Sequence, residues 1–380
     1  MAAVTPPPPT LPRGPRGSPL TGHAAEWNRD PLAFLTRCAR EHGDAVPIRL
    51  GPVRFVVLSR PDLVEQVLVT DQRSFGKGSS HRLTRSLLGN GLLSSEGELW
   101  LRQRRLAQPA FHRERVAAYA GTMVAYTERA LATWRDGEVR DVHQKMMRLT
   151  LQIAAKTLFN TDVAEEASAA GATVDAVGFG GALTRALERF DGRTSTLVLM
   201  LPVALPLPGN LRFTRALRDL DRTVYGIIDR RRHHATEEAD PGDLLSLLLR
   251  ARDDAGAGMT DRQLRDETIT LLFAGHETAA LALTWAWYLL ALHPEAEARL
   301  FAEVDGVLGE RSPTVADLPR LTYARRVIDE SLRLYPPAPA VVASPPATRR
   351  SATSSPCWRR SCCWPPLRGA TVSRSCLGSA

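Results

Sequence analysis

The sequence has 380 residues, of which 44% are hydrophobic and 24% are charged. This balance is typical of a folded protein with a sizeable core and excludes disorder as its main state. The net charge is +8, but Ser344–Ala380 holds six arginines and no lysine or acid, so the rest of the chain carries only +2. Because the excess charge lies in one segment and forms no patterned basic face, we expect no nucleic-acid partner.

Cysteine usage and the first residues indicate where the protein works. Cys38 is the only cysteine before Cys357, so the main part of the chain is no disulfide scaffold. Residues 1–19 predict a proline-rich, extended lead-in that lacks the basic start and apolar run of a signal peptide. The longest apolar stretch, Ala279–Leu292, has 14 residues, short of the roughly 18–20 that cross a bilayer. We therefore expect a cytoplasmic protein with no membrane insertion.

The first predicted elements are a helix and a small sheet. Helical spacing covers Pro31–His42, and two β-branched runs within Ala45–Leu58 flank a Gly51-Pro52 turn, which predicts a hairpin. From Glu96 onward the pattern is helical, interrupted by a proline- and glycine-rich loop at Pro202–Asn210. The chain is therefore expected to be mainly α with a minor β-sheet.

The longest predicted helix begins near Thr260. Thr260 and Gln263 fit a capping box, and His293-Pro294 marks the end, which gives about 33 residues. The second half, from Leu281, is apolar on nearly all faces, so we expect the helix to run through the interior.

A polar cluster, Ala274-Gly275-His276-Glu277-Thr278, interrupts this helix at mid-length. Glycine in a helix interior costs roughly 0.8–1.0 kcal/mol relative to alanine, and a buried carboxylate costs more unless it is paired. Small residues let a flat ligand lie against the backbone, and an adjacent acid and alcohol can relay protons. In the alternative interpretation, Thr278 bonds back to a carbonyl one turn earlier and Glu277 pairs with a basic neighbour.

Two further pairs have helical spacing. Glu330 and Arg333, three residues apart, share a helix face and can form an ion pair. Trp100 and Arg104, four apart, suit a packed ring beside a cation aimed at a buried anion. Surface ion pairing and surface cation–π packing are the simpler interpretations.

Together, Trp100-x-x-x-Arg104, the cluster Ala274–Thr278 and Glu330-x-x-Arg333 resemble, in this order, the C-, I- and K-helix motifs of the cytochrome P450 family. The likeness covers about Leu11–Val342. It implies a P450-type fold and a monooxygenase that uses haem b and O2 to insert one oxygen atom into a small apolar substrate. It also implies a ferredoxin- or flavodoxin-type electron donor.

The resemblance also implies a role for each matched residue. Arg104, with the Trp100 indole beside it, would bind a haem propionate. Ala274 and Gly275 would border the distal haem face and leave space for O2.

In the same resemblance, Thr278 and Glu277 are the catalytic pair. Thr278 would hydrogen-bond oxygen bound at that face, and Glu277 would help to deliver protons. Glu330 and Arg333 would support the fold of the proximal side.

After Ala343 the sequence departs from the family. No stretch of Ser344–Ala380 matches the iron-binding loop Phe-x-x-Gly-x-x-x-Cys-x-Gly. Cys376 lies in Arg-x-Cys-x-Gly, but Gly369 and Val372 stand where the loop needs Phe and Gly. We therefore assign no metal ligand.

These observations predict three regions: the lead-in 1–19, a truncated P450-like domain over 20–343 that lacks its proximal C-terminal part, and a disordered tail over 344–380 whose composition resembles a shifted reading frame. Two functions remain open. One is a P450 monooxygenase, inactive as written because the cysteine loop is absent. The other is a non-catalytic helical protein that binds a ligand or a partner.

Overall fold

A computed structural model of the protein describes residues 14–77, 81–160, 207–234 and 243–344. They belong to two compact units. The small unit comprises residues up to 78 together with the segment from 343, and the helical unit comprises residues 79–342. The predicted tail beyond Ser344 and residues 1–13 of the predicted lead-in lie outside the described residues. One domain over residues 20–343 stays a prediction.

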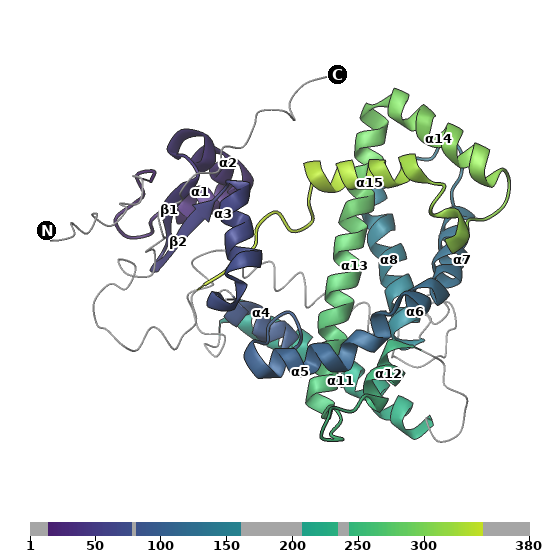
Figure 1. Ribbon diagram of the computed structural model, residues 1–380, viewed down its shortest axis with the longest axis horizontal. Coiled ribbons are helices and arrows are strands. Elements are labelled where there is room, and N and C mark those ends of the chain that lie inside the picture. Colours follow the sequence, from purple (N-terminus) through teal and green to yellow (C-terminus); the bar gives the residue numbers. More distant parts are fainter. Residues whose placement is uncertain (1–13, 78–80, 161–206, 235–242, 345–380) are drawn as a thin grey trace, which may run out of the picture. The chain divides into compact units, whose positions relative to one another are not determined.

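The small unit contains the predicted hairpin (Figure 1). Strands β1 (Ala45–Leu50) and β2 (Val53–Leu58) pair antiparallel, with Ala45 opposite Leu58. Gly51 turns the chain with φ +58°, which glycine adopts without steric cost. Alternate residues of β1, Val46 and Ile48, point to one face of the sheet, where they pack with Phe34 and Cys38.

Short helices complete the small unit. The Asp30 carboxylate accepts a hydrogen bond from the Ala33 amide at 2.9 Å and so caps the predicted helix at its expected start. Burial raises the pKa of the Cys38 thiol on this helix. The helical elements of the small unit are α1 (Ala24–Arg29), α2 (Pro31–His42), α3 (Pro61–Glu65), the π turn η1 (Gln66–Thr70) and the 3₁₀ turn η2 (Gln72–Ser74).

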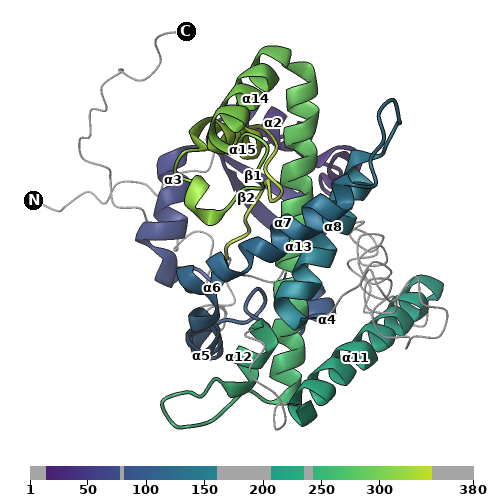
Figure 2. The same ribbon diagram turned by 90° about the vertical axis from the view of Figure 1, so that its right-hand side faces the viewer.

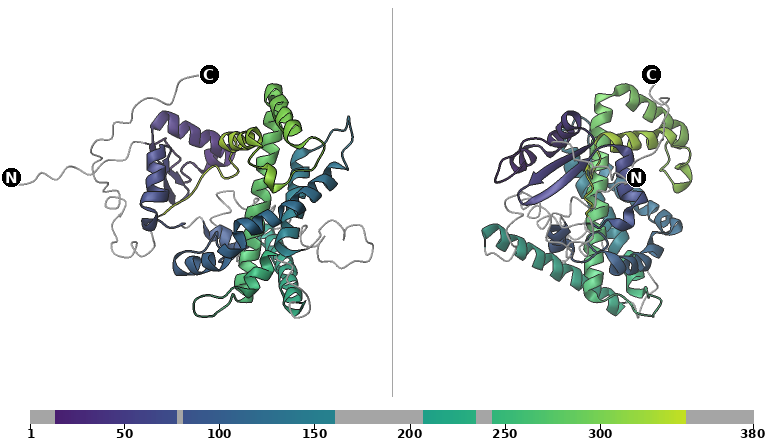
Figure 3. Two further views of the ribbon diagram at one scale, coloured as in Figure 1. Left: turned by 45° about the vertical axis from the view of Figure 1, so that its right-hand side comes forward. Right: turned by 60° about the vertical axis from the view of Figure 1, so that its left-hand side comes forward.

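The helical unit is organised around one long helix, α13 (Asp261–Leu292), drawn in green in Figures 1 to 3. Helix α8 (Val142–Phe159) runs alongside α13. Helices α11 (Pro208–His234) and α12 (Leu244–Arg250) pack near the N-terminal half of α13, and α15 (Thr322–Leu334) packs near its C-terminal half. The other helical elements described in this unit are α4 (His81–Leu88), α5 (Gly97–Ala107), η3 (Gln108–Phe111), α6 (Arg113–Ala118), α7 (Ala120–Leu131), α14 (Pro294–Leu308) and η4 (Val315–Asp317).

The ends of α13 confirm the prediction from sequence. The Gln263 amide donates to Thr260 Oγ1 at 3.3 Å, and the Thr260 amide donates to Gln263 Oε1 at 2.9 Å, which completes the capping box. The helix ends before His293, and Pro294 begins α14, a position where proline lacks no needed hydrogen bond. For the same reason α11 begins at Pro208, so the predicted loop over Pro202–Asn210 ends earlier than expected.

Burial along α13 differs from the expectation. Leu264, Ile269 and Leu272 in the first half are fully buried in a core shared with α11 and α12. In the apolar second half, Trp287 is 43% exposed and Leu292 is 56% exposed. The prediction of a buried second half is wrong because apolar composition does not by itself provide a packing partner on every face. In the first half, by contrast, Arg265, Asp266 and Glu267 are buried with hydrogen-bond partners.

The core around α13 leads to a stability prediction. Leu272→Ala removes a fully buried side chain and should lower the free energy of unfolding by about 2–5 kcal/mol. Leu292→Ala on the same helix is the control, and because Leu292 is mostly exposed the loss should stay below about 1 kcal/mol. Urea unfolding at equilibrium measures both values. Equal losses would contradict this assignment of the core.

Candidate active site

The six predicted site residues lie on two helices of the helical unit. Trp100 and Arg104 lie on α5, and the cluster Ala274–Thr278 lies at the middle of α13. The structure thus places both motifs in one compact unit, on regular elements whose backbones fix the direction of each side chain.

One face of α13 at the cluster is open and built from small residues. Ala274, Gly275 and Thr278 are exposed, whereas His276 is only 3% exposed. Apart from the adjoining residues and the backbone of its own helix turns, a Cβ atom built on Gly275 meets no described atom within 4 Å. Because small side chains let a flat group approach the helix backbone, this face can accept a planar ligand.

The hydroxyl of Thr278 has a local partner. It donates to the Ala274 carbonyl oxygen, one turn earlier, at 2.6 Å. This is the local bond that the sequence offered as the alternative to a catalytic role. The oxygen lone pairs of the exposed Thr278 hydroxyl still can accept a hydrogen bond from a bound group. Glu277, beside Thr278, is half-buried.

Helix α5 presents a cation beside an aromatic ring. The guanidinium carbon of Arg104 lies 5.3 Å from the ring centroid of Trp100, which confirms that the two residues share a face. Arg102 is held by Asp253 through a hydrogen bond of 2.6 Å, and Arg105 lies 3.9 Å from Asp254. Within the part of the chain that the structure describes, Arg104 has no acidic partner. Its charge is therefore available to an anion such as a carboxylate of a ligand.

The Glu330–Arg333 pair forms as predicted. The Nε and Nη2 atoms of Arg333 donate to the two carboxylate oxygens of Glu330 at 2.7 and 2.6 Å. These hydrogen bonds lower the pKa of Glu330. Both side chains are more than half exposed, so the pair contributes little to stability by itself.

His276 is a buried titratable group that the sequence did not single out. It lies within the motif cluster, and its Nδ1 atom has no hydrogen-bond partner among the described residues. Burial lowers its pKa from 6.5 to about 4, because a low-dielectric environment disfavours the charged imidazolium. The sequence signal was present, because this histidine lies at the middle of a long helix that was expected to run through the interior.

The lowered pKa of His276 predicts a pH-dependent stability. Between about pH 6.5 and pH 4 the unfolded state binds a proton that the folded state does not. The free energy of unfolding should therefore decrease as the pH falls through this window, by about 3 kcal/mol. Urea unfolding at several pH values measures the slope, and His276→Gln serves as the non-titrating comparison. If the free energy of unfolding of His276→Gln changed with pH as steeply as that of the parent, the lowered pKa of His276 would be contradicted.

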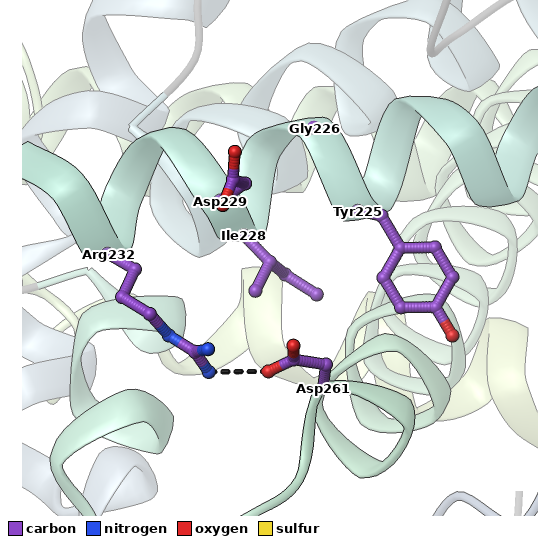
Figure 4. Close-up of a pocket in the computed structure, with 6 residues that line it drawn as sticks. All are labelled: Tyr225, Gly226, Ile228, Asp229, Arg232 and Asp261. Atoms are coloured by element: carbon purple, nitrogen blue, oxygen red, sulfur yellow. Dashed lines mark hydrogen bonds and ion pairs between the residues drawn. The ribbon is translucent and has the colours of Figure 1, made fainter.

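A pocket of about 330 Å³ lies elsewhere, between α11 and the start of α13 (Figure 4). Arg232 reaches across it to pair with Asp261. The pocket contains none of the six predicted site residues; it is lined by Tyr225, Gly226, Ile228, Asp229, Arg232 and Asp261. A cavity shared by α5 and the motif cluster stays a prediction.

The residues that the resemblance assigns to a haem group can be tested for their fit. The open small-residue face of α13 suits a flat macrocycle, and Arg104 with Trp100 suits its propionates. The described ranges hold no group of three or more His, Cys, Asp or Glu side chains placed to bind a metal. Cys38 is 1% exposed in the small unit, and the other cysteines lie outside the described residues. The distal half of a haem site therefore fits, and the absence of an iron ligand stays a prediction.

Among the described residues, no helix is both long and apolar enough to cross a membrane.

The motifs and the helical fold agree with the comparisons to known proteins. A model of the family "Cytochrome P450" matches residues 12–344, which is most of the chain. The chain belongs to the cytochrome P450 family and is an enzyme of that type. The match ends at the point where the sequence was expected to depart from the family.

Two relatives from Streptomyces show the similarity at the level of single proteins. The chain is 42% identical over 325 residues to cyclooctatin synthase of Streptomyces melanosporofaciens, covering 85% of this chain and 68% of that protein. It is 38% identical over 330 residues to pentalenene oxygenase of Streptomyces avermitilis, covering 85% and 69%. The crystal structure of the cytochrome P450DA haem domain superposes with a TM-score of 0.73 at 27% identity, covering 86% of this chain and 70% of that one. These matches confirm the predicted mainly helical P450 fold.

Proposed function

We propose that this chain derives from a haem-dependent monooxygenase that inserts one atom of O2 into a small, apolar, terpenoid-like substrate. The observation that carries the proposal is the open face of Ala274, Gly275 and Thr278 on α13, inside a family match that covers the whole helical unit. The names of cyclooctat-9-en-7-ol 5-monooxygenase and pentalenene oxygenase, 42% and 38% identical, support the reaction and the apolar substrate class.

Each site residue then has a stated task. Arg104 binds a propionate of the haem, and the Trp100 ring limits the motion of the guanidinium. Ala274 and Gly275 keep side chains away from the distal face. Haem, when bound, supplies the activation of O2.

Thr278 and Glu277 act on protons. The Thr278 hydroxyl offers a hydrogen bond at the open face, and its bond to the Ala274 carbonyl orients it. Glu277, the adjacent acid, holds and passes a proton toward that face. A ferredoxin- or flavodoxin-type protein donates the electrons, and a cytoplasmic location is part of the same proposal.

We further propose that the 380-residue polypeptide is itself inactive. The family match stops at residue 344, and the residues after it contain no complete cysteine loop. The second candidate, a non-catalytic helical protein that binds an apolar ligand, is favoured by one observation: large side chains such as Trp287 and Tyr288 of α13 are 43% and 48% exposed.

A completed chain tests the proposal. In this variant, the completed chain, residues 345–380 are replaced by the part of pentalenene oxygenase that follows its aligned region. With haem, an electron donor and pentalenene, it should consume O2 and release a hydroxylated product, whereas the parent chain should not. A completed chain that binds haem but oxidises neither pentalenene nor other polycyclic hydrocarbons would contradict the proposed substrate class.

A further inference from the structure

We propose that Asp266 and Glu267, two buried acids of α13, are positioning residues that fix the start of α5 and so hold Trp100 and Arg104 in register with the motif cluster. The inference rests on the proposed function for its purpose. The structural claim, that these acids hold one helix relative to another, needs no haem to be tested.

Both acids are inside the protein. Asp266 is 3% exposed and Glu267 is 0% exposed. A carboxylate taken out of water is costly unless hydrogen bonds replace its hydration. Asp266 precedes Ala274 by eight residues, or about 12 Å along the helix. The two acids and the motif cluster therefore lie on one rigid element.

Their partners are backbone amides of one distant loop. The Asn90 amide donates to Asp266 Oδ2 at 2.8 Å, and the Leu92 amide donates to Glu267 Oε2 at 3.1 Å. Both donors belong to the connection between α4 and α5, about 175 positions earlier in the chain. Because the donors are backbone amides, the two acids hold the main chain of the loop, whatever its side chains are.

Two glycines allow the loop to lie directly on α13. A Cβ atom at Gly89, whose φ is +60°, would lie 2.0 Å from Asp266 Oδ1. A Cβ atom at Gly91 would lie 2.1 Å from Thr270 Oγ1 and 2.6 Å from the Asp266 carbonyl oxygen. Both distances are far below van der Waals contact. Only glycine fits at these two positions with the hydrogen bonds intact.

The loop leads directly into α5, so fixing its backbone on α13 also fixes the start of α5. Ser94 closes it with a hydroxyl bond of 2.6 Å to the Gly89 carbonyl and an amide bond of 2.9 Å to the Gly91 carbonyl. Glu96 then occupies the N-cap position of α5, and its carbonyl oxygen accepts a hydrogen bond from the Trp100 amide at 3.5 Å. Helix α5 also packs on α12 and η3, and Arg102 at its middle donates to the Gly258 carbonyl just before α13 at 3.0 Å. The loop adds a link to α13 at the start of α5.

The charge of Asp266 is balanced within the same cluster. Arg265 donates from Nη1 to Asp266 Oδ1 at 2.9 Å and from Nε to Asp221 Oδ1 of α11 at 2.7 Å. The side chain of Arg265 is itself 9% exposed. Arg265 therefore gives Asp266 a cationic partner on one carboxylate oxygen, while the other oxygen accepts from the loop amide.

The test measures the distance between α5 and α13 in the full chain without haem. Native cysteines are replaced, and spin labels are attached at Glu98→Cys and Ala279→Cys, two exposed positions. A second pair, Arg148→Cys on α8 with Ala279→Cys, reports the remaining helix packing. Distances are measured by double electron–electron resonance in the parent and in three variants: Glu267→Leu, Glu267→Gln and Gly91→Ala.

We expect the α5–α13 distance distribution to at least double in width in Glu267→Leu and Gly91→Ala, while the α8–α13 distribution is unchanged. Glu267→Gln keeps an oxygen acceptor, so its α5–α13 distance distribution should stay as narrow as that of the parent. An unchanged α5–α13 distance in both disruptive variants would overturn the inference. Equal broadening of both pairs would also overturn it, because the acids would then serve general folding. Neither result depends on whether the completed chain has monooxygenase activity.

Discussion

Replacing Thr278 by alanine in the completed chain should separate the consumption of reductant from the formation of product. The variant should lose at least about tenfold in product formed per reductant consumed, which is less than the roughly 10²–10⁴-fold rate contribution of a positioned proton-transfer group. The physical reason is the loss of the only hydroxyl on the open face of Ala274, Gly275 and Thr278. Without it, reduced oxygen leaves as hydrogen peroxide before it reaches the substrate.

Helix α13 offers a matched control. Thr284 also donates to a carbonyl one turn earlier, Ala280 O, at 2.7 Å, just as Thr278 does to Ala274. Thr284→Ala therefore removes the same local bond from the same helix, away from the motif cluster, and should leave coupling unchanged. Thr278→Ser should retain most of it. The simultaneous assay of product, peroxide and reductant decides, and an unaltered product yield in Thr278→Ala would remove this residue from the catalytic assignment.

Features set by neighbouring residues could be predicted from the sequence. The hairpin depends on the Gly51-Pro52 turn, and the start of α13 depends on Thr260 and Gln263, three residues apart. The Glu330–Arg333 pair likewise needs only helical spacing. In each case the interacting groups lie within one turn or one hairpin, so local rules suffice.

Features set by distant residues could not be predicted. Asp266 and Glu267 resemble a solvated helix face, and their burial depends on amides about 175 positions away. The same limit explains the reversed burial of α13, whose first half is covered by α11 and α12. The small residues of the motif cluster pointed to an open face by themselves. A catalytic role for Thr278 was favoured only through the family resemblance, because spacing alone allowed its local hydrogen bond equally well.

The second large effect concerns iron ligation in the 380-residue polypeptide. A thiolate on the iron is the ligand that favours O–O cleavage in P450 enzymes. Cys38 is buried with Phe34 and Val46 in the small unit, and Cys376 lacks the Phe and Gly of the family's loop. The parent chain should therefore form no thiolate-ligated haem, and its monooxygenase activity should be at background.

The most direct measurement is the absorption spectrum of the reduced protein with CO. The parent chain and the completed chain are purified with excess haem, reduced and exposed to CO under identical conditions. The completed chain should give the strongly red-shifted Soret band of a thiolate-ligated haem, and the parent chain should give none. A stable band of this type in the parent chain, abolished by Cys376→Ala, would make Cys376 the axial ligand and contradict the proposal that the iron site is missing.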